Sequence, residues 1–166
     1  MAHDPSRREI LTDYILSHQE EFYRLAYSYV KNRDTALDVV QESIVRALSR
    51  ADSLRDPAYV KTWFYRILVN ESINHFRRSS RLVPLELVSQ EEPGEVRDDA
   101  ARLDLYDAIE RLNTQEQTII RLRFFHDMKL EEIAQVTRTN LNTVKSRLYQ
   151  SLRKLKAMTK EDCNDA

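Results

Sequence analysis

The residues best suited to chemistry form a polar stripe near the C-terminal end of the chain. Its hydrogen-bonding and cationic side chains recur at three- and four-residue spacing: Asn142, Lys145, Ser146, Tyr149, Gln150 and Arg153. On a helix this spacing puts them on one face. Amide, hydroxyl and ammonium groups bind base edges in the DNA major groove, and basic groups bind phosphates. We therefore interpret the stripe as a DNA-contacting face, and expect Lys154 and Lys156 to hold backbone phosphates.

A helix over about 140–158 must carry this stripe, with Val144, Leu148, Leu152 and Leu155 as its buried side. A short helix over 130–136 precedes it, and this order is that of a helix-turn-helix. From residue 138 to residue 156 there are six basic residues and no acidic one, although the whole chain has a net charge of −1. The alternative is an amphipathic helix whose basic face only contacts water.

A second candidate stripe lies on a helix predicted from an Asp56-Pro57 start to about residue 80. Asn70 and Asn74 occupy its interior, although asparagine is a poor helix former. With Arg66 and Arg77 they offer amides and cations to an unstacked single strand. The alternative is that these asparagines simply face solvent.

A third stripe lies on a helix predicted to begin at Asp34, with Leu37, Val40, Ile44, Ala47 and Leu48 on its buried face. Asp38, Gln41 and Glu42 share the other face, as the residues of a partner-binding surface do. Ordinary surface helices have the same pattern, so the stripe alone is only weakly specific.

These stripes belong to an all-α chain of two small helical domains, over 1–80 and 102–160, joined by a flexible acidic linker over 81–101. The first domain should contain three helices, the first of them from Leu11 to Val30. The second should contain four, with a helix over Leu103–Leu112 and a capping box of Thr114 and Gln117.

The composition argues against enzymatic activity. The chain has one glycine, so a phosphate-binding loop or a dinucleotide fingerprint is ruled out. Its four histidines are scattered, and its one cysteine is Cys163. We predict no catalytic residue, no metal and no cofactor. We also expect no small-molecule substrate and no membrane insertion, and a cytoplasmic location.

The C-terminal motifs resemble those of a known family. Glu132-Ile133-Ala134, followed by the run Thr143–Leu148, is similar to region 4 of the extracytoplasmic-function (ECF) sigma factors, within the sigma-70 family. The resemblance implies minus-35 contacts by Lys145, Ser146, Tyr149 and Gln150, with Arg123 on phosphate. Two positions depart from the family pattern. Arg138 stands where glycine is frequent and φ is positive, and Asn142 replaces a glycine.

The N-terminal motifs point to the same family. The run Lys61–Asn70 resembles regions 2.3–2.4, which implies minus-10 recognition and melting by four residues together with the loop Asp52–Arg55 and the basic Arg77. The four matching positions are Tyr65, Ile67, Asn70 and Asn74. The run Asp38–Ser43 resembles region 2.2, which implies that Asp38, Gln41 and Glu42 bind the β′ clamp helices of RNA polymerase.

The resemblance implies a sigma factor that binds core RNA polymerase through its β′ and β subunits and recognises promoter DNA. An anti-sigma factor is implied as a regulator. One alternative is a stand-alone helix-turn-helix regulator, which would bind a palindromic duplex without polymerase. A purely helical adaptor would leave the asparagine stripe and the basic helix unexplained.

Overall fold

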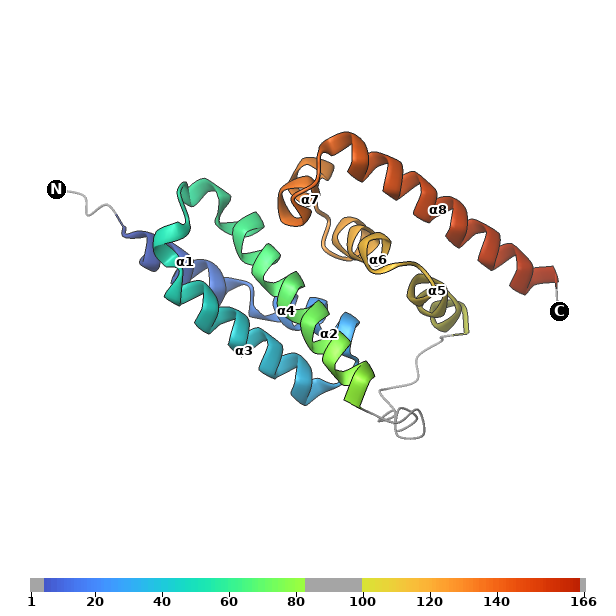
Figure 1. The fold of residues 1–166 in the computed structure, drawn as a ribbon, viewed down its shortest axis with the longest axis horizontal. Helices are drawn as coiled ribbons and strands as arrows, with labels where there is room; N and C mark the ends of the chain where they lie inside the picture. Colours follow the sequence, from blue (N-terminus) through green and yellow to red (C-terminus); the bar gives the residue numbers. More distant parts are fainter. Residues whose placement is uncertain (1–4, 83–99, 165–166) are drawn as a thin grey trace. The chain divides into compact units, whose positions relative to one another are not determined.

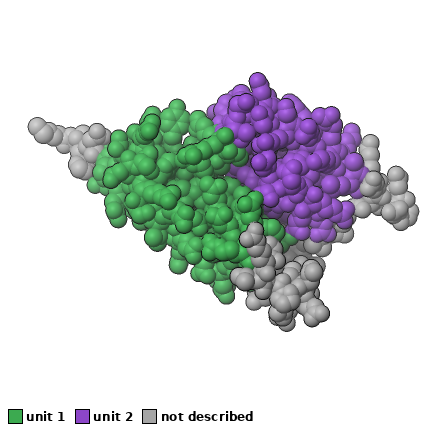
Figure 2. Space-filling view, in the orientation of Figure 1, with its two compact units in different colours: residues 1–82, 135–138 green, residues 83–134, 139–166 purple. Residues whose placement is uncertain are grey.

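A computed structural model describes residues 5–82 and 100–164, and within these ranges every regular element is helical (Figure 1). The chain divides into two compact units, one of residues 1–82 and 135–138 and the other of residues 83–134 and 139–166 (Figure 2). The prediction of an all-α chain with two helical domains is confirmed. No helix in the described part of the chain is both long and apolar enough to cross a bilayer.

Four helices and two short 3₁₀ turns build the first unit. In chain order they are α1 (Arg7–Ser17), α2 (Gln19–Val30), α3 (Arg33–Ser49), η1 (Ala51–Ser53), η2 (Pro57–Tyr59) and α4 (Val60–Leu82). The predicted single first helix is divided at His18, where φ is −128° and ψ is 20°. The His18 imidazole lies 2.8 Å from the Tyr14 carbonyl, which belongs to the last turn of α1. This unit therefore has one more helix than predicted.

Helix α4 is the central helix of the first unit and packs against α1, α2 and α3. Phe64 on α4 and Phe22 on α2 are fully buried, with ring centroids 4.4 Å apart. Leu11 and Leu25 complete the core around them. Asp56 accepts the Ala58 N–H at 3.0 Å and so caps η2, and α4 follows directly. The core thereby leaves few positions of α4 open to solvent.

The buried face of α3 differs from the predicted one. The residues that face the core are Ala36, Val39, Val40, Ser43 and Ala47. Leu37, predicted to be buried, is 43 % exposed. The small side chains at 36, 43 and 47 let α3 approach its neighbours closely, which explains the choice of face. The predicted start at Asp34 is also wrong, because Asn32 caps the helix by accepting the Thr35 N–H at 3.0 Å.

The second unit contains α5 (Ala100–Glu110), α6 (Thr114–Ile120), a π-helical turn η4 (Arg121–Phe125), most of α7 (Leu130–Thr137) and α8 (Leu141–Asn164). The last residues of α7, from Gln135 on, are grouped with the first unit. A capping box starts α6, but Asn113 and Glu116 form it, one residue before the predicted pair. Ile119, Leu122 and Ile133 are buried in this unit. Most of the predicted linker lies outside the described residues.

Candidate nucleic-acid interface

Helices α7 and α8 and the turn between them form the helix-turn-helix. Arg138 has a left-handed φ of 52°, as its position in the turn predicts. The Arg138 N–H donates to the Gln135 carbonyl at 3.4 Å, and the Thr139 N–H to the Ala134 carbonyl at 3.0 Å. These two bonds form the Schellman motif that ends many helices. Asn140 then caps α8 by accepting the Thr143 N–H at 2.8 Å.

The exposed and the buried residues of α8 lie on different faces, as the predicted polar stripe requires. All six residues of the polar stripe are exposed: Asn142, Lys145, Ser146, Tyr149, Gln150 and Arg153. The buried residues are Val144, Leu148, Ser151 and Leu155. Leu152, predicted to lie among them, is 37 % exposed, so that prediction is wrong. Spacings of four, three and four fit the helical period better than the predicted four, four and three.

Arg123 and Lys154 were both expected to bind phosphate. Arg123 is exposed, and its guanidinium donates one hydrogen bond to the Met128 carbonyl at 3.1 Å. Lys154 instead donates to the carboxylate of Glu116, with 2.9 Å between Nζ and Oε1. Lys156 is exposed on the following turn.

Glu116 is unusual because its carboxylate side chain is almost fully buried in the second unit. Burial raises the pKa of Glu116, but hydrogen bonds from the Lys154 ammonium, the Asn113 N–H and the Ser151 hydroxyl outweigh that effect and hold the pKa below its ordinary value. Nothing in the sequence pattern identified Glu116 beforehand. The one available signal was an acidic residue three positions after Asn113.

On α4, the predicted minus-10 residues fall into two groups. Asn70, Asn74 and Arg77 are exposed. Tyr65 is only 1 % exposed and Ile67 only 9 %, so the expectation that these two face DNA is wrong. The Tyr65 ring packs edge-on against Phe22 at 5.6 Å, and its hydroxyl donates to Glu21 at 3.4 Å. Both side chains belong to the core because α4 has neighbours on several sides.

The loop before α4 contains both buried and exposed side chains. Leu54 and Ala51 are buried, whereas Asp52, Ser53 and Arg55 are exposed. The following turn exposes the aromatic ring of Tyr59, for which the sequence predicted no role. The loop thus offers hydrogen-bonding groups and one ring for stacking.

On α3, Asp38, Gln41 and Glu42 are exposed, as a docking surface requires. Leu37 and Val45 are exposed on the same helix, so aliphatic and polar groups alternate there. We call these five residues the α3 stripe. The exposed aliphatic pair was missed because the sequence pattern placed Leu37 in the core.

Glu42, Glu71 and His75 have ligand atoms within 4.8 Å of one another, which is close enough to consider a metal site. Arg46 already pairs with Glu71, with 3.0 Å between Nε and Oε1, and His75 pairs with Glu42 at 2.7 Å. A guanidinium in the cluster opposes a second cation, since like charges repel at this range. The cluster is therefore a set of polar contacts between α3 and α4, which consists of the Arg46–Glu71 ion pair and the His75–Glu42 hydrogen bond.

Comparison with known proteins gives matches over both units. Residues 14–82 match sigma-70 region 2, and residues 102–155 match sigma-70 region 4. RNA polymerase sigma factor SigV of Bacillus subtilis is 43 % identical over 98 % of this chain and 99 % of its own length. The ECF RNA polymerase sigma-E factor of Haemophilus influenzae is 27 % identical over 81 % of this chain and 79 % of its own.

Two solved structures share the fold. The sigma factor RpoE of Bartonella quintana, in complex with the anti-sigma factor NepR, has a TM-score of 0.67 at 21 % identity and covers 90 % of this chain and 96 % of its own. CnrH, in complex with the cytosolic domain of CnrY, has a TM-score of 0.69 at 24 % identity and covers 92 % and 88 %. With two region matches and a relative similar over its full length, this chain belongs to the sigma-70 family of RNA polymerase sigma factors, in the extracytoplasmic-function group.

Proposed function

We propose that this protein binds core RNA polymerase and directs promoter-specific initiation of transcription, with one unit on each promoter element. The observation that carries the proposal is the pairing of two exposed surfaces with the two matched sigma regions. In region 2 these residues are Asn70, Asn74 and Arg77, and in region 4 they are the polar stripe of α8, which we call the α8 stripe. The protein would act in the cytoplasm, where polymerase and DNA are found. Its contribution is binding energy, and the polymerase makes the bonds.

The α8 stripe binds the minus-35 element in the major groove. Asn142, Lys145 and Ser146 lie near the start of α8, the part of a recognition helix that reaches base edges. Tyr149 and Gln150 extend the same exposed face by one turn. Arg123 holds a backbone phosphate and sets the register of the duplex.

The first unit opens the minus-10 element. A base extruded from the duplex loses a few kcal/mol of stacking, which contacts on the protein must offset. Asn70 and Asn74 supply amides for its edge, and Arg77 supplies charge for the strand. The loop Asp52–Arg55 encloses the base. Since Tyr65 and Ile67 are buried, they support this surface from below and do not contact the base.

The α3 stripe docks on the β′ clamp helices. Its acidic residues Asp38 and Glu42 suit a basic partner, and Leu37 and Val45 add apolar area. Alternation of this kind is typical of transient protein interfaces. In the second unit, exposed apolar side chains suit the β subunit: Leu105, Tyr106, Phe124 and Phe125. The rings of Tyr106 and Phe125 lie 5.8 Å apart.

An anti-sigma factor regulates the protein by covering these same surfaces. RpoE was solved with the anti-sigma factor NepR, and CnrH with the cytosolic domain of CnrY. The exposed apolar side chains of the two units give such a partner something to bury.

Run-off transcription with purified core polymerase tests the proposed function. The protein should yield a transcript from a promoter with both elements, and none from templates in which either element is scrambled. Lys145→Ala should reduce minus-35-dependent initiation. A stand-alone regulator would instead bind a palindromic duplex tightly without polymerase, and such binding with no transcript would overturn the proposal.

A further inference from the structure

A buried carboxylate links the two helices that support the DNA-contacting face of the second unit. Glu116 lies in the first turn of α6 and is 2 % exposed. Locally it completes the capping box, because its Oε1 accepts the Asn113 N–H at 3.4 Å. A capping glutamate normally stays near water, so its burial calls for partners elsewhere in the fold.

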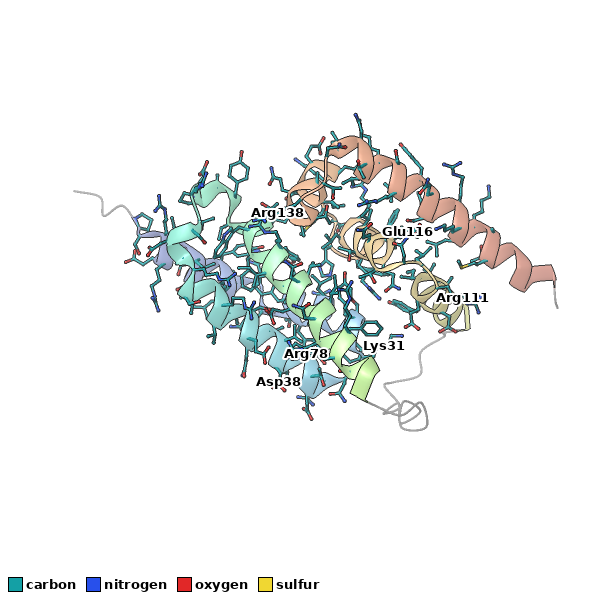
Figure 3. All side chains as sticks on the ribbon, viewed as in Figure 1. Lys31, Asp38, Arg78, Arg111, Glu116 and Arg138 are labelled. Atoms are coloured by element: carbon teal, nitrogen blue, oxygen red, sulfur yellow. The ribbon has the colours of Figure 1, made fainter. Side chains whose placement is uncertain are left out.

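Those partners come from α8, which packs against α6. The Lys154 ammonium donates to Glu116 Oε1 at 2.9 Å. The Ser151 hydroxyl lies 3.3 Å from Oε2 and 2.6 Å from the Arg147 carbonyl, so its single proton is shared between two acceptors. Figure 3 marks Glu116 on α6. Ser151 is fully buried on the face of α8 where Val144, Leu148 and Leu155 pack. A serine at a core position of the helix leaves room for the carboxylate.

We infer that Glu116, through Lys154 and Ser151, is a positioning residue that fixes the rotation and register of α8 on α6, and that Lys154 is consequently not a phosphate contact. This inference rests on the proposed minus-35 role of α8. The Lys154 side chain is half exposed and lies in the basic segment, but its ammonium group is bound to the buried Glu116.

The physical reason is that apolar contacts alone fix a helix poorly about its own axis. The hydrophobic attraction between leucine and valine side chains has no preferred direction, whereas a charged hydrogen bond has a narrow range of distance and direction. A rotation of α8 by about 10° would move a side-chain tip at a radius of about 5–6 Å by roughly 1 Å. Hydrogen bonds from Lys145 or Gln150 to base edges do not survive such a shift.

Two methionine variants of the full chain, assembled with core polymerase, separate positioning from phosphate contact. Lys154→Met removes the pair, and Lys156→Met removes a neighbouring exposed charge as the matched control. Binding is measured on promoters with an intact and a scrambled minus-35 element across a range of salt. A lost phosphate contact lowers the salt slope by about 0.9 and weakens both promoters alike.

We expect Lys154→Met to weaken binding to the intact promoter about tenfold, to leave binding to the scrambled promoter unchanged, and to keep the salt slope. Lys156→Met should retain the preference for the intact promoter. A lower salt slope with intact discrimination for Lys154→Met overturns the inference, as does no effect at all. If the wild-type protein itself fails to discriminate, the proposed function fails first.

A cycle with Glu116→Gln adds a second readout. If the two groups act as a pair, the double variant Glu116→Gln/Lys154→Met binds no worse than the poorer single variant; additive losses contradict the pairing. A carboxyl NMR titration of the wild-type chain needs no variant to fold. It should give Glu116 a pKa below the ordinary value, and an ordinary or raised pKa overturns the pairing.

Discussion

The imidazole Nε2 of His75 lies 2.7 Å from the carboxylate Oε2 of Glu42, and this contact joins α4 to α3. One turn away, Arg46 on α3 pairs with the buried Glu71 on α4. Two polar contacts thus hold α4, which carries the exposed asparagines, against α3. Glu42 itself belongs to that stripe, so a partner that binds Glu42 competes with His75 for it.

The contact between His75 and Glu42 makes the first unit sensitive to acid. The hydrogen bond with His75 holds the pKa of Glu42 below its ordinary value of 4.5. The pair therefore adds stability above that pH and loses it as the pH falls through the lowered pKa. Because Glu42 is half exposed, the gain stays below about 1 kcal/mol.

His75→Phe, which keeps a ring but removes the hydrogen bond, should lower the melting temperature at about pH 7 and have little effect near pH 3. Thermal unfolding followed by circular dichroism measures the difference. Asp38→Asn removes another exposed carboxylate of α3 and serves as the control. Its effect on the melting temperature should be the same at both pH values. An equal loss for His75→Phe at both pH values would contradict the pairing.

The exposed Leu37 should contribute to polymerase binding but little to folding. Leu37→Ser should weaken affinity for core polymerase on the order of tenfold, since its apolar area is buried only in the complex. The free energy of unfolding should change by no more than about 0.5 kcal/mol. Leu16→Ser alters another exposed leucine of the same unit and should leave affinity unchanged. A large fall in the free energy of unfolding for Leu37→Ser would show that Leu37 packs in the core.

Periodicity and turn chemistry predicted the parts of the fold that depend on local sequence. The α7–α8 pair and the Asp56-Pro57 start follow from rules that involve a few neighbouring residues. The positive φ of Arg138 was implied by the family resemblance. The break at His18 has no glycine or proline to mark it. It depends on a side-chain contact to Tyr14 that a pattern of apolar residues does not encode.

The remaining errors in the prediction concern which face of a helix packs against the core. Leu37 and Leu152 are apolar and lie close to the buried stripe of their helices, so periodicity alone includes them. The outcome depends on small residues, Ala36 on α3 and Ser151 on α8, which allow a close approach or admit a polar partner. Tyr65 was misplaced for a different reason, because α4 is surrounded by other helices.

The burial of Tyr65 predicts that its ring matters for stability and its hydroxyl hardly at all for the promoter. Tyr65→Ala should destabilise the first unit by about 3–5 kcal/mol through the cavity it leaves. Tyr65→Phe keeps the ring against Phe22 and should open promoters at the wild-type rate. Denaturant unfolding and an open-complex assay measure the two effects. If the Tyr65→Phe protein folds but fails to open promoters, the Tyr65 hydroxyl contacts DNA after all.

The turn of the helix-turn-helix offers a stabilising change. Arg138→Gly should raise stability by about 1 kcal/mol, because glycine has no Cβ to strain at a φ of 52°. Arg50, an arginine at another helix end, has a φ of −113° and serves as the matched control. Arg50→Gly should give no gain, since its conformation suits any residue and glycine loses more entropy on folding. Equal gains for both, measured by thermal unfolding, would argue against backbone strain at Arg138.

The exposed Asn70 separates promoter opening from promoter binding. If its amide holds an extruded base, Asn70→Ala should slow open-complex formation by about tenfold, since a hydrogen bond to a base is worth on the order of 1–2 kcal/mol. Closed-complex affinity should stay within about twofold, because the base is still stacked at that stage. Permanganate reactivity of unpaired thymines reports opening, and a filter assay on duplex DNA in the cold reports closed binding. Ser79→Ala, an exposed change near the end of α4, should leave both steps unaltered. Equal losses of Asn70→Ala in the two steps would place this residue on the duplex and not on the melted strand.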